Sequence, residues 1–238
     1  MKMKKQLIVL LLLLIAGAAG AQNAYNGAHK YDGKHKNELS GYFMAGRNVV
    51  TRGFGGLELS YKRHLTDRWY AGVDAQAQFG KQLYSNDIFG GYRLPIGWSD
   101  FYFVGKVMYN RYHRWNTNEY IGNLSLTWEM PYFFVRVGES LIHFHTVHFS
   151  YNEPLTFTFG TGVNIRPRWN SWNIGLFFRN YDDFYFENWN INWGLHFYAT
   201  VAKQMHLFGE FNIRPAGSMS QLASKYEASG KLGLKYVW

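Results

Sequence analysis

A period-two alternation of apolar and polar side chains runs through this chain from Glu38 to its last residue, Trp238. In the segment "WYAGVDAQAQFG" (69–80) one face is apolar or aromatic, and the other carries Gly, Asp and Gln. The segments "LTFTFGTGVNIR" (155–166) and "NWNINWGLHFYATV" (188–201) repeat the pattern. Successive side chains of a β-strand point to opposite faces, so the alternation predicts strands with one apolar face.

The same test predicts an all-β chain of about twelve strands, with ten or fourteen as alternatives. The predicted spans are 38–47, 54–64, 69–80, 87–97, 101–112, 119–129, 132–141, 154–166, 172–181, 187–202, 206–214 and 225–238. Most are long enough for a tilted membrane crossing, which needs about 9–11 residues. Strands of soluble domains are shorter, with about 5–6 residues. Long alternating strands therefore favour a transmembrane barrel over a soluble sandwich or lipocalin-like barrel.

The connections between these strands alternate in length. Short links such as "GWSD" and "EMPY" take turns with longer ones such as "IHFHTVHFSYNE" and "RPAGSMSQLAS". Outer-membrane barrels have short periplasmic turns and longer extracellular loops. An even strand number then places both termini on the periplasmic side. Closure is required because the hydrocarbon layer offers no partner for an open sheet edge.

Large aromatic residues gather at the predicted strand ends. One group lies at the ends assigned to the periplasmic side: Trp69, Trp98, Trp128, Trp172 and Trp238. A second lies at the opposite ends: Tyr120, Trp189 and Tyr226. Tyr and Trp favour the membrane–water interface, so these residues predict two aromatic girdles.

The first 21 residues have the pattern of a secretory signal peptide. "MKMKKQLIVLLLLLIAGAAGAQ" has a basic start, an apolar core and small residues before Gln22, which predicts cleavage after Ala21. An uncleaved anchor is the alternative, but the apolar core is short for a spanning helix. Residues 22–37 are polar and non-periodic and predict a flexible periplasmic segment, which leaves 38–238 for the barrel. The formal net charge is +9, and about +6 without the three leader lysines.

The last eight residues, "KLGLKYVW", resemble the C-terminal assembly signal of bacterial outer-membrane β-barrel proteins. That signal has a polar residue, a glycine, an apolar residue and a terminal aromatic at set positions. Lys231, Gly233, Tyr236 and Trp238 match it. The resemblance implies a porin-like protein of the Gram-negative outer membrane, with membrane lipid and the barrel-assembly machinery as partners. No narrower subfamily is indicated.

When alternate residues along each predicted strand are assigned to the interior, the predicted lumen is basic. Nine cations face five acids (Glu58, Asp74, Glu129, Glu210 and Glu227), an excess of about +4. The predicted pore-lining cations are Lys62, Arg93, Lys106, Arg136, Arg166, Arg179, Arg214, Lys231 and Lys235. Fixed positive charge favours anionic solutes, and Arg binds carboxylates bidentately. The expected function is a small, monomeric, passive channel for small anionic solutes. Strand number and basic lumen are similar to those of channels for acidic oligosaccharides.

Two alternatives to a channel remain open. The interior charges can instead pair across strands and fill a non-conducting structural or adhesive barrel. The segment "IHFHTVHFSYNEP" supplies the other alternative, because His148 and Ser150 resemble the His-x-Ser arrangement of outer-membrane acyl hydrolases. Strict alternation places Ser150 on the lumen side, unless a bulge reverses the alternation. A lipid hydrolase needs its nucleophile at the lipid-facing wall. A channel is therefore favoured over an enzyme.

Several other classes find no support. His143 and His145 share one face of an extended segment and suit a divalent metal, but ordinary loop polarity explains them as well. We therefore predict no cofactor and no metal.

There is no cysteine, hence no disulfide framework or thiolate metal site. Lys and Arg are scattered singly along strands, which disfavours a nucleic-acid-binding surface.

Overall fold

The computed structural model describes residues 34, 36–48, 52–79, 83–113, 116–167, 170–180, 191–215 and 226–238. The predicted signal peptide (1–21), most of the predicted N-terminal segment (22–37) and Trp189 lie outside these residues. Within strands, the side chains of Arg214, Tyr226 and Glu227 also lie outside the described part. No helix in the described ranges is long and apolar enough to cross a membrane.

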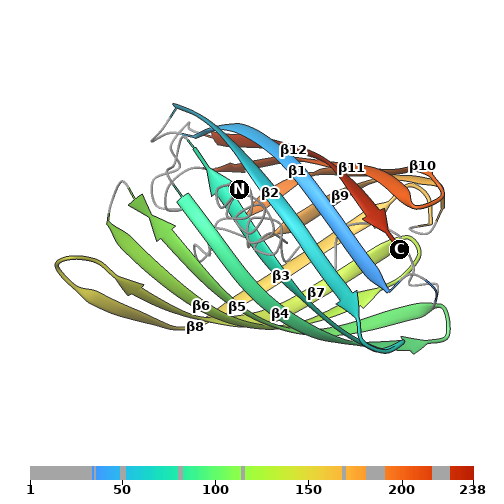
Figure 1. The fold of residues 1–238 in the computed structure, drawn as a ribbon, viewed down its shortest axis with the longest axis horizontal. Coiled ribbons are helices and arrows are strands. Elements are labelled where there is room, and N and C mark those ends of the chain that lie inside the picture. Colours follow the sequence, from blue (N-terminus) through green and yellow to red (C-terminus); the bar gives the residue numbers. More distant parts are fainter. Residues whose placement is uncertain are drawn as a thin grey trace, which may run out of the picture.

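Twelve antiparallel strands form one closed barrel in which each strand pairs with its neighbours in sequence (Figure 1). The strands are β1 (Asn37–Asn48), β2 (Arg52–His64), β3 (Trp69–Gln78), β4 (Leu83–Ile96), β5 (Ser99–Tyr112), β6 (Thr117–Glu129), β7 (Phe133–His145), β8 (Ser150–Asn164), β9 (Trp172–Arg179), β10 (Asn192–Ala202), β11 (Met205–Pro215) and β12 (Tyr226–Val237). The predicted all-β barrel of twelve strands is confirmed.

The two ends of the chain close the barrel. β1 pairs with β12 from Glu38 opposite Val237 to Arg47 opposite Ala228. Beyond this ladder, the backbone N–H of Asn37 donates to the carbonyl of Trp238 at 2.9 Å, and Trp238 N–H donates back at 3.0 Å. The terminal tryptophan thus completes the last hydrogen-bonded pair of the seam, which leaves no free edge between the first and last strands.

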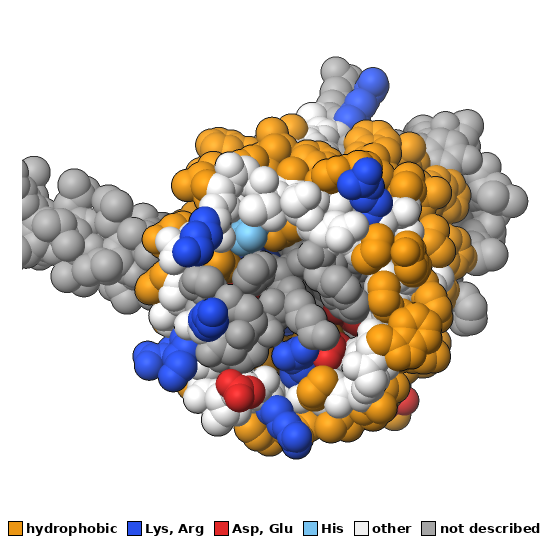
Figure 2. All heavy atoms as spheres, turned by 90° about the vertical axis from the view of Figure 1, so that its right-hand side faces the viewer, with side chains coloured by type: hydrophobic (Ala, Val, Ile, Leu, Met, Phe, Trp, Pro, Cys, Tyr) orange, Lys and Arg blue, Asp and Glu red, His pale blue; other side chains and the backbone are white. Residues whose placement is uncertain are grey.

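The alternation in sequence becomes an alternation between the two sides of the wall. Along β3 and β9 every second residue is buried, and those between are more exposed and apolar. Outward-facing apolar side chains such as Phe43, Ile88, Val107 and Leu124 are about 70% exposed. An end-on view shows hydrophobic side chains around the outside and charged ones within the mouth (Figure 2). This inside-out polarity suits a barrel whose outer wall meets lipid.

The five predicted girdle tryptophans all lie at one end of the barrel. Trp69 and Trp172 begin strands, Trp98 lies in the turn between β4 and β5, Trp128 precedes the last residue of β6, and Trp238 ends the chain. All are 37–68% exposed. Several pack on other rings, as Trp69 does on Tyr92 at 4.8 Å between centroids. The five tryptophans therefore lie at the same end of the barrel, as the alternation predicted.

The largest departure from the predicted connections is the segment 142–153, which is not a loop. β7 continues to His145 and β8 starts at Ser150, so only four residues join them. This hairpin projects beyond its neighbours at the left of Figure 1. The pairing shifts by one residue where Ser140 faces Thr156 but Ile142 faces Glu153, and Leu155 there has φ +26°. A bulge of this kind reverses which residues of the strand face outward.

Candidate functional site

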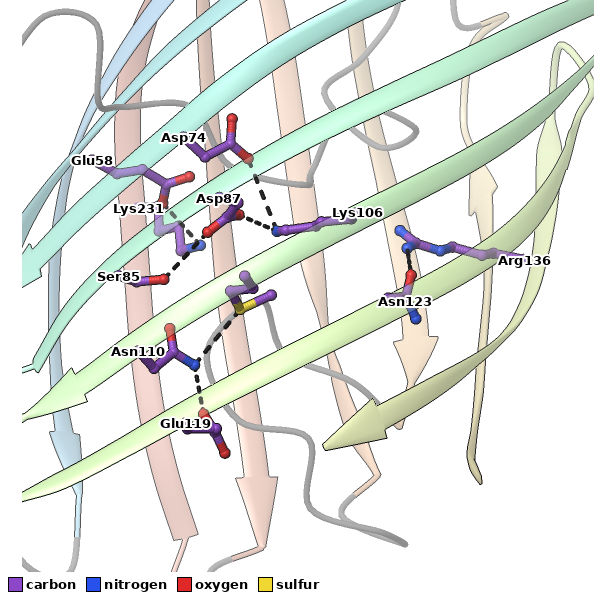
Figure 3. Close-up of polar contacts among 11 residues, drawn as sticks. Glu58, Asp74, Ser85, Asp87, Lys106, Asn110, Glu119, Asn123, Arg136 and Lys231 are labelled. Carbon is purple, nitrogen blue, oxygen red and sulfur yellow. Dashed lines mark hydrogen bonds and ion pairs between the residues drawn. The ribbon is translucent and has the colours of Figure 1, made fainter. Parts of the chain in front are cut away.

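The barrel interior is a layer of buried charged side chains, and its middle is held by Lys106 of β5. Asp74 and Asp87 lie opposite each other on β3 and β4 and turn their carboxylates to the same side. The Lys106 ammonium contacts Asp87 closely and lies 3.9 Å from Asp74 (Figure 3). All three side chains are at most 6% exposed. One cation therefore balances two neighbouring carboxylates in a site largely screened from water.

A second cluster lies inside the barrel near the two chain ends. Glu38 of β1 accepts from Lys62 Nζ at 2.6 Å and contacts His64 Nε2 at 3.1 Å, both on β2. Lys235 of β12 lies 3.4 Å away on the other side. Because Glu38 belongs to the first strand and Lys235 to the last, this cluster joins the two strands that close the barrel.

Three further ion pairs line the wall. Arg93 of β4 binds Asp100 of β5 at 3.0 Å. Lys231 of β12 reaches across β1 to Glu58 of β2 at 3.6 Å, a pair drawn in Figure 3. Arg179 of β9 reaches across β10 to Glu210 of β11 at 2.5 Å. Both pairs that skip a strand join a long cation and a glutamate, whose side chains on the same face span two inter-strand spacings of about 4.8 Å each.

Two arginines stand on either side of one glycine. Gly160 of β8 lies directly opposite Arg136 of β7 and directly opposite Arg179 of β9. Arg136 also donates to the amide oxygen of Asn123 at 3.4 Å, and Arg179 to that of Asn192 at 3.2 Å. From these positions the two guanidinium groups extend away from Gly160, Arg136 toward β6 and Arg179 toward β10 and β11. Arginine binds carboxylates through two parallel hydrogen bonds, so this part of the wall has the residue type that suits carboxylate-bearing solutes.

The described interior charges are distributed unequally around the barrel. On β1–β6, three cations stand against seven acids, a formal balance of −4. On β7–β12, four cations stand against one acid, a balance of +3. The seven acids are Glu38, Glu58, Asp74, Asp87, Asp100, Glu119 and Glu129. Fixed charge of opposite sign on facing walls produces a field across the lumen.

Seven of the nine predicted pore-lining cations face the interior: Lys62, Arg93, Lys106, Arg136, Arg179, Lys231 and Lys235. Arg166 does not, because it follows the last residue of β8. Its exposed guanidinium lies 3.8 Å from the ring of Trp172 in the turn. Arg214 belongs to β11, with its side chain outside the described residues.

The predicted charge excess of the lumen is not present among the described residues. Four interior acids escaped the sequence count, namely Glu38, Asp87, Asp100 and Glu119. Each lies within two residues of a predicted strand end, and the alternation of its strand, extended to that position, assigns it to the interior. Eight described acids thus face seven described cations, and the ion-pair alternative accounts for much of the interior.

The His-rich segment forms pairs across the β7–β8 hairpin. His145 Nδ1 lies 2.7 Å from Ser150 Oγ, and His143 Nδ1 lies 2.5 Å from Asn152 Oδ1. The bulge turns Ser150 and Asn152 outward, to the side that alternation from Thr156 does not predict. His148 lies exposed in the turn, and Ser150 contacts His145. The amide contacts His143 and the serine contacts His145, so no Ser–His–Asn relay is assembled.

The four residues of the assembly-signal motif have separate places in β12. Lys231 and Gly233 face inward, where a Cβ on Gly233 would lie 2.4 Å from the carbonyl oxygen of Gly41. Tyr236 faces outward and donates to the side-chain oxygen of Gln204 at 3.2 Å, while its ring stacks on Trp238. Glycine at position 233 is thus required by the close approach of β1, independently of recognition during assembly.

The outer wall has an apolar groove of about 580 Å³ across β3–β8. Two outward-facing glycines, Gly90 and Gly105, lie opposite each other at its floor, and Leu124 and Phe157 line it. Glu139 of β7 also lines the groove and is exposed on the outward face. A carboxylate in this position is unusual for a lipid-facing wall.

Comparisons with known proteins give the fold but no family. No family model and no curated protein matches the sequence. The structure is similar to a KdgM porin in complex with disordered oligogalacturonate, with TM-score 0.56, 8% identity, and 84% and 99% of the two chains covered. A NanC porin is similar with TM-score 0.53 and 10% identity, and the match covers 84% of this chain and 98% of the porin. An active-site mutant of outer membrane phospholipase A from Escherichia coli is similar with TM-score 0.50 and 9% identity, and the match covers 93% of this chain and 98% of the enzyme.

These likenesses define the class of protein by its fold. The chain has the fold of bacterial outer-membrane β-barrels, as the sequence predicted. Channels and an enzyme share this fold at about 10% identity, so it does not select a function.

Proposed function

We propose that this protein is a passive outer-membrane channel for small solutes, with carboxylate-bearing solutes as its preferred class. The observation that carries the proposal is the arginine pair Arg136 and Arg179 on either side of Gly160, on the basic half of a polarised interior. A purely structural barrel needs no such division between acidic and basic walls. The field across the lumen orients a charged solute, and the guanidinium groups bind its carboxylate.

Small acidic oligosaccharides fit this chemistry. The KdgM porin, which has a similar fold, is described in complex with disordered oligogalacturonate, an acidic sugar chain. The carboxylates of such a chain match the arginine pair, and its hydroxyls match the Asn, Ser and Thr side chains of the interior wall. Because most interior acids and cations are paired, we expect a narrow channel of small conductance.

The proposal includes a location and a topology. The outward apolar wall and the tryptophan girdle suit an outer membrane, with both termini and the short connections in the periplasm. Residues 1–21 act as the signal peptide and 22–37 as a periplasmic extension. The barrel functions as a monomer surrounded by lipid and reaches the membrane through the barrel-assembly machinery, which reads "KLGLKYVW".

Planar-bilayer recording with the purified barrel tests this function. We expect discrete conductance steps, and we expect galacturonate oligomers to block or slow the current more than neutral oligomers of the same length. Arg136→Gln with Arg179→Gln should remove that difference. A barrel that stays electrically silent under all voltages would contradict the channel. Release of fatty acid from phospholipid that is lost in Ser150→Ala would instead support the hydrolase alternative.

A further inference from the structure

The two outward-facing histidines of the β7–β8 hairpin form a chelating pair. His143 and His145 occupy alternate positions of β7, on the same face as the exposed Leu141. Two residues apart on a strand, their backbones are separated by about 6.7 Å. Imidazole side chains at that spacing reach the same ion without any change in the strand.

The cross-strand contacts set the protonation of the first ring. Asn152 Oδ1 lies 2.5 Å from Nδ1 of His143. An amide oxygen only accepts hydrogen bonds, so Nδ1 of His143 carries the proton and its Nε2 carries the lone pair. Metal-binding histidines in proteins have this arrangement, in which the second ring nitrogen donates to a neighbouring side chain.

The second ring also has a hydrogen-bond partner. Ser150 Oγ lies 2.7 Å from Nδ1 of His145. A hydroxyl can accept the Nδ1 proton, and a metal ion at Nε2 selects that tautomer. Both partners come from β8, and the bulge at Leu155 brings them to the outer face. Without the register shift, Ser150 and Asn152 would face the interior. The bulge therefore supplies both imidazoles with an oriented hydrogen-bond partner at once.

We propose that Nε2 of His143 and Nε2 of His145 together bind one divalent transition-metal ion at the outer surface of this hairpin. Two neutral imidazoles favour Cu²⁺, Ni²⁺ or Zn²⁺ over the hard ions Mg²⁺ and Ca²⁺. The described residues contain no group of three or more His, Cys, Asp or Glu placed to hold a metal. Water or an external solute group therefore occupies the remaining coordination positions, and the bound ion is exchangeable. The site does not depend on the channel proposal.

Zn²⁺ titration of the untagged, detergent-solubilised protein by calorimetry tests the site. His143→Gln and His145→Gln should each weaken the tightest binding event about tenfold or more, and the double variant should remove it. Asn152→Ala should weaken it by about tenfold through loss of ring orientation. His113→Gln should leave it unchanged, since His113 is exposed at another strand end with its ring against Tyr84.

Electron paramagnetic resonance with Cu²⁺ gives a readout that does not depend on affinity. The wild-type spectrum should report two coordinating imidazole nitrogens, and each single variant should report one. All variants should keep the folded, heat-modifiable mobility of a barrel, because the substitutions lie on an exposed hairpin. Equal Zn²⁺ affinity and equal Cu²⁺ spectra for the wild type and the double variant would overturn the proposal and assign binding to other histidines.

Discussion

The two halves of the barrel interior differ in their balance of acidic and basic side chains. Among the described interior side chains of β1–β6, acids outnumber cations seven to three, and Lys106 is placed between two carboxylates. Among those of β7–β12, cations outnumber acids four to one, and Gly160 separates two arginines. Part of the difference comes from pairing across the closure seam, where two lysines of β12 bind acids of β1 and β2. The rest leaves the two walls with formal charges of opposite sign.

The halves are joined by ion pairs at the closure seam. Lys231 and Lys235 of β12 bind Glu58 and Glu38, which belong to the acidic half. Removing one partner of a buried pair costs more than the pair contributes, because the remaining charge loses its solvation without compensation. Substitutions in the middle of the acidic half should therefore give the largest losses of stability.

Lys106→Met should have the largest effect. It leaves Asp74 and Asp87 adjacent and without their shared cation, which should destabilise the barrel by about 3–5 kcal/mol. Urea unfolding in lipid vesicles, followed by tryptophan fluorescence, measures this change. Lys203→Met removes the same charge from an exposed turn and should change the free energy of unfolding by less than about 0.5 kcal/mol. Equal effects of the two substitutions would mean that the interior pairs contribute little.

Gly233→Val should destabilise the seam between the halves by about 1–3 kcal/mol through overpacking. Its Cβ would meet the carbonyl oxygen of Gly41 at 2.4 Å and the ring of Phe208 at 2.7 Å. Gly122→Val is the matched control, because a Cβ at that position has no neighbour within 4 Å. Yield of folded barrel in vitro, without assembly machinery, separates this steric cost from recognition of the C-terminal signal. A folded yield equal to that of the control would refute the steric account.

Glu139→Leu should stabilise the protein slightly. Glu139 is a charged residue of the basic half that faces outward, into the apolar groove, so it balances none of the interior cations. Replacing a lipid-facing carboxylate by an apolar residue should add about 1 kcal/mol to the free energy of unfolding in vesicles. Glu210→Leu should act in the opposite direction, since it removes the partner of Arg179. A loss of stability in Glu139→Leu would indicate that this carboxylate has a partner at the outer wall.

The alternation in sequence was sufficient to predict the barrel, its strands and the direction of most side chains. It failed at Ser150 and Asn152, because one bulge at Leu155 reverses the phase. The adjacent Pro154 is a sequence sign of such a bulge, since proline inside a strand is confined to edges, strand starts and bulges. The ion pairs between non-adjacent strands were also beyond prediction. Glu58 and Lys231 meet only because the barrel closes, and the pair is separated by most of the chain.

Charge balance shows a similar limit. Of the nine cations predicted to line the lumen, seven described ones face the interior, and the side chain of Arg214 lies outside the described residues. Arg166 lies in the turn, because the strand ends at Asn164. Glu38 and Asp100, near strand ends, were left out of the predicted lumen although alternation assigns them to it. The sign of the lumen therefore depends on a few residues at strand boundaries, where sequence patterns are least reliable.

Reversal potential in a salt gradient tests the central claim most directly. The double variant Arg136→Glu with Arg179→Glu changes the formal balance of the basic half by four charges, from +3 to −1 for its described side chains, and leaves the acidic half intact. The wild type should prefer anions more strongly than the double variant does, while the neutral exchange Thr127→Ser at another buried interior position should change little. An unchanged reversal potential in the double variant would contradict the account, because ions would then cross without contacting the basic wall.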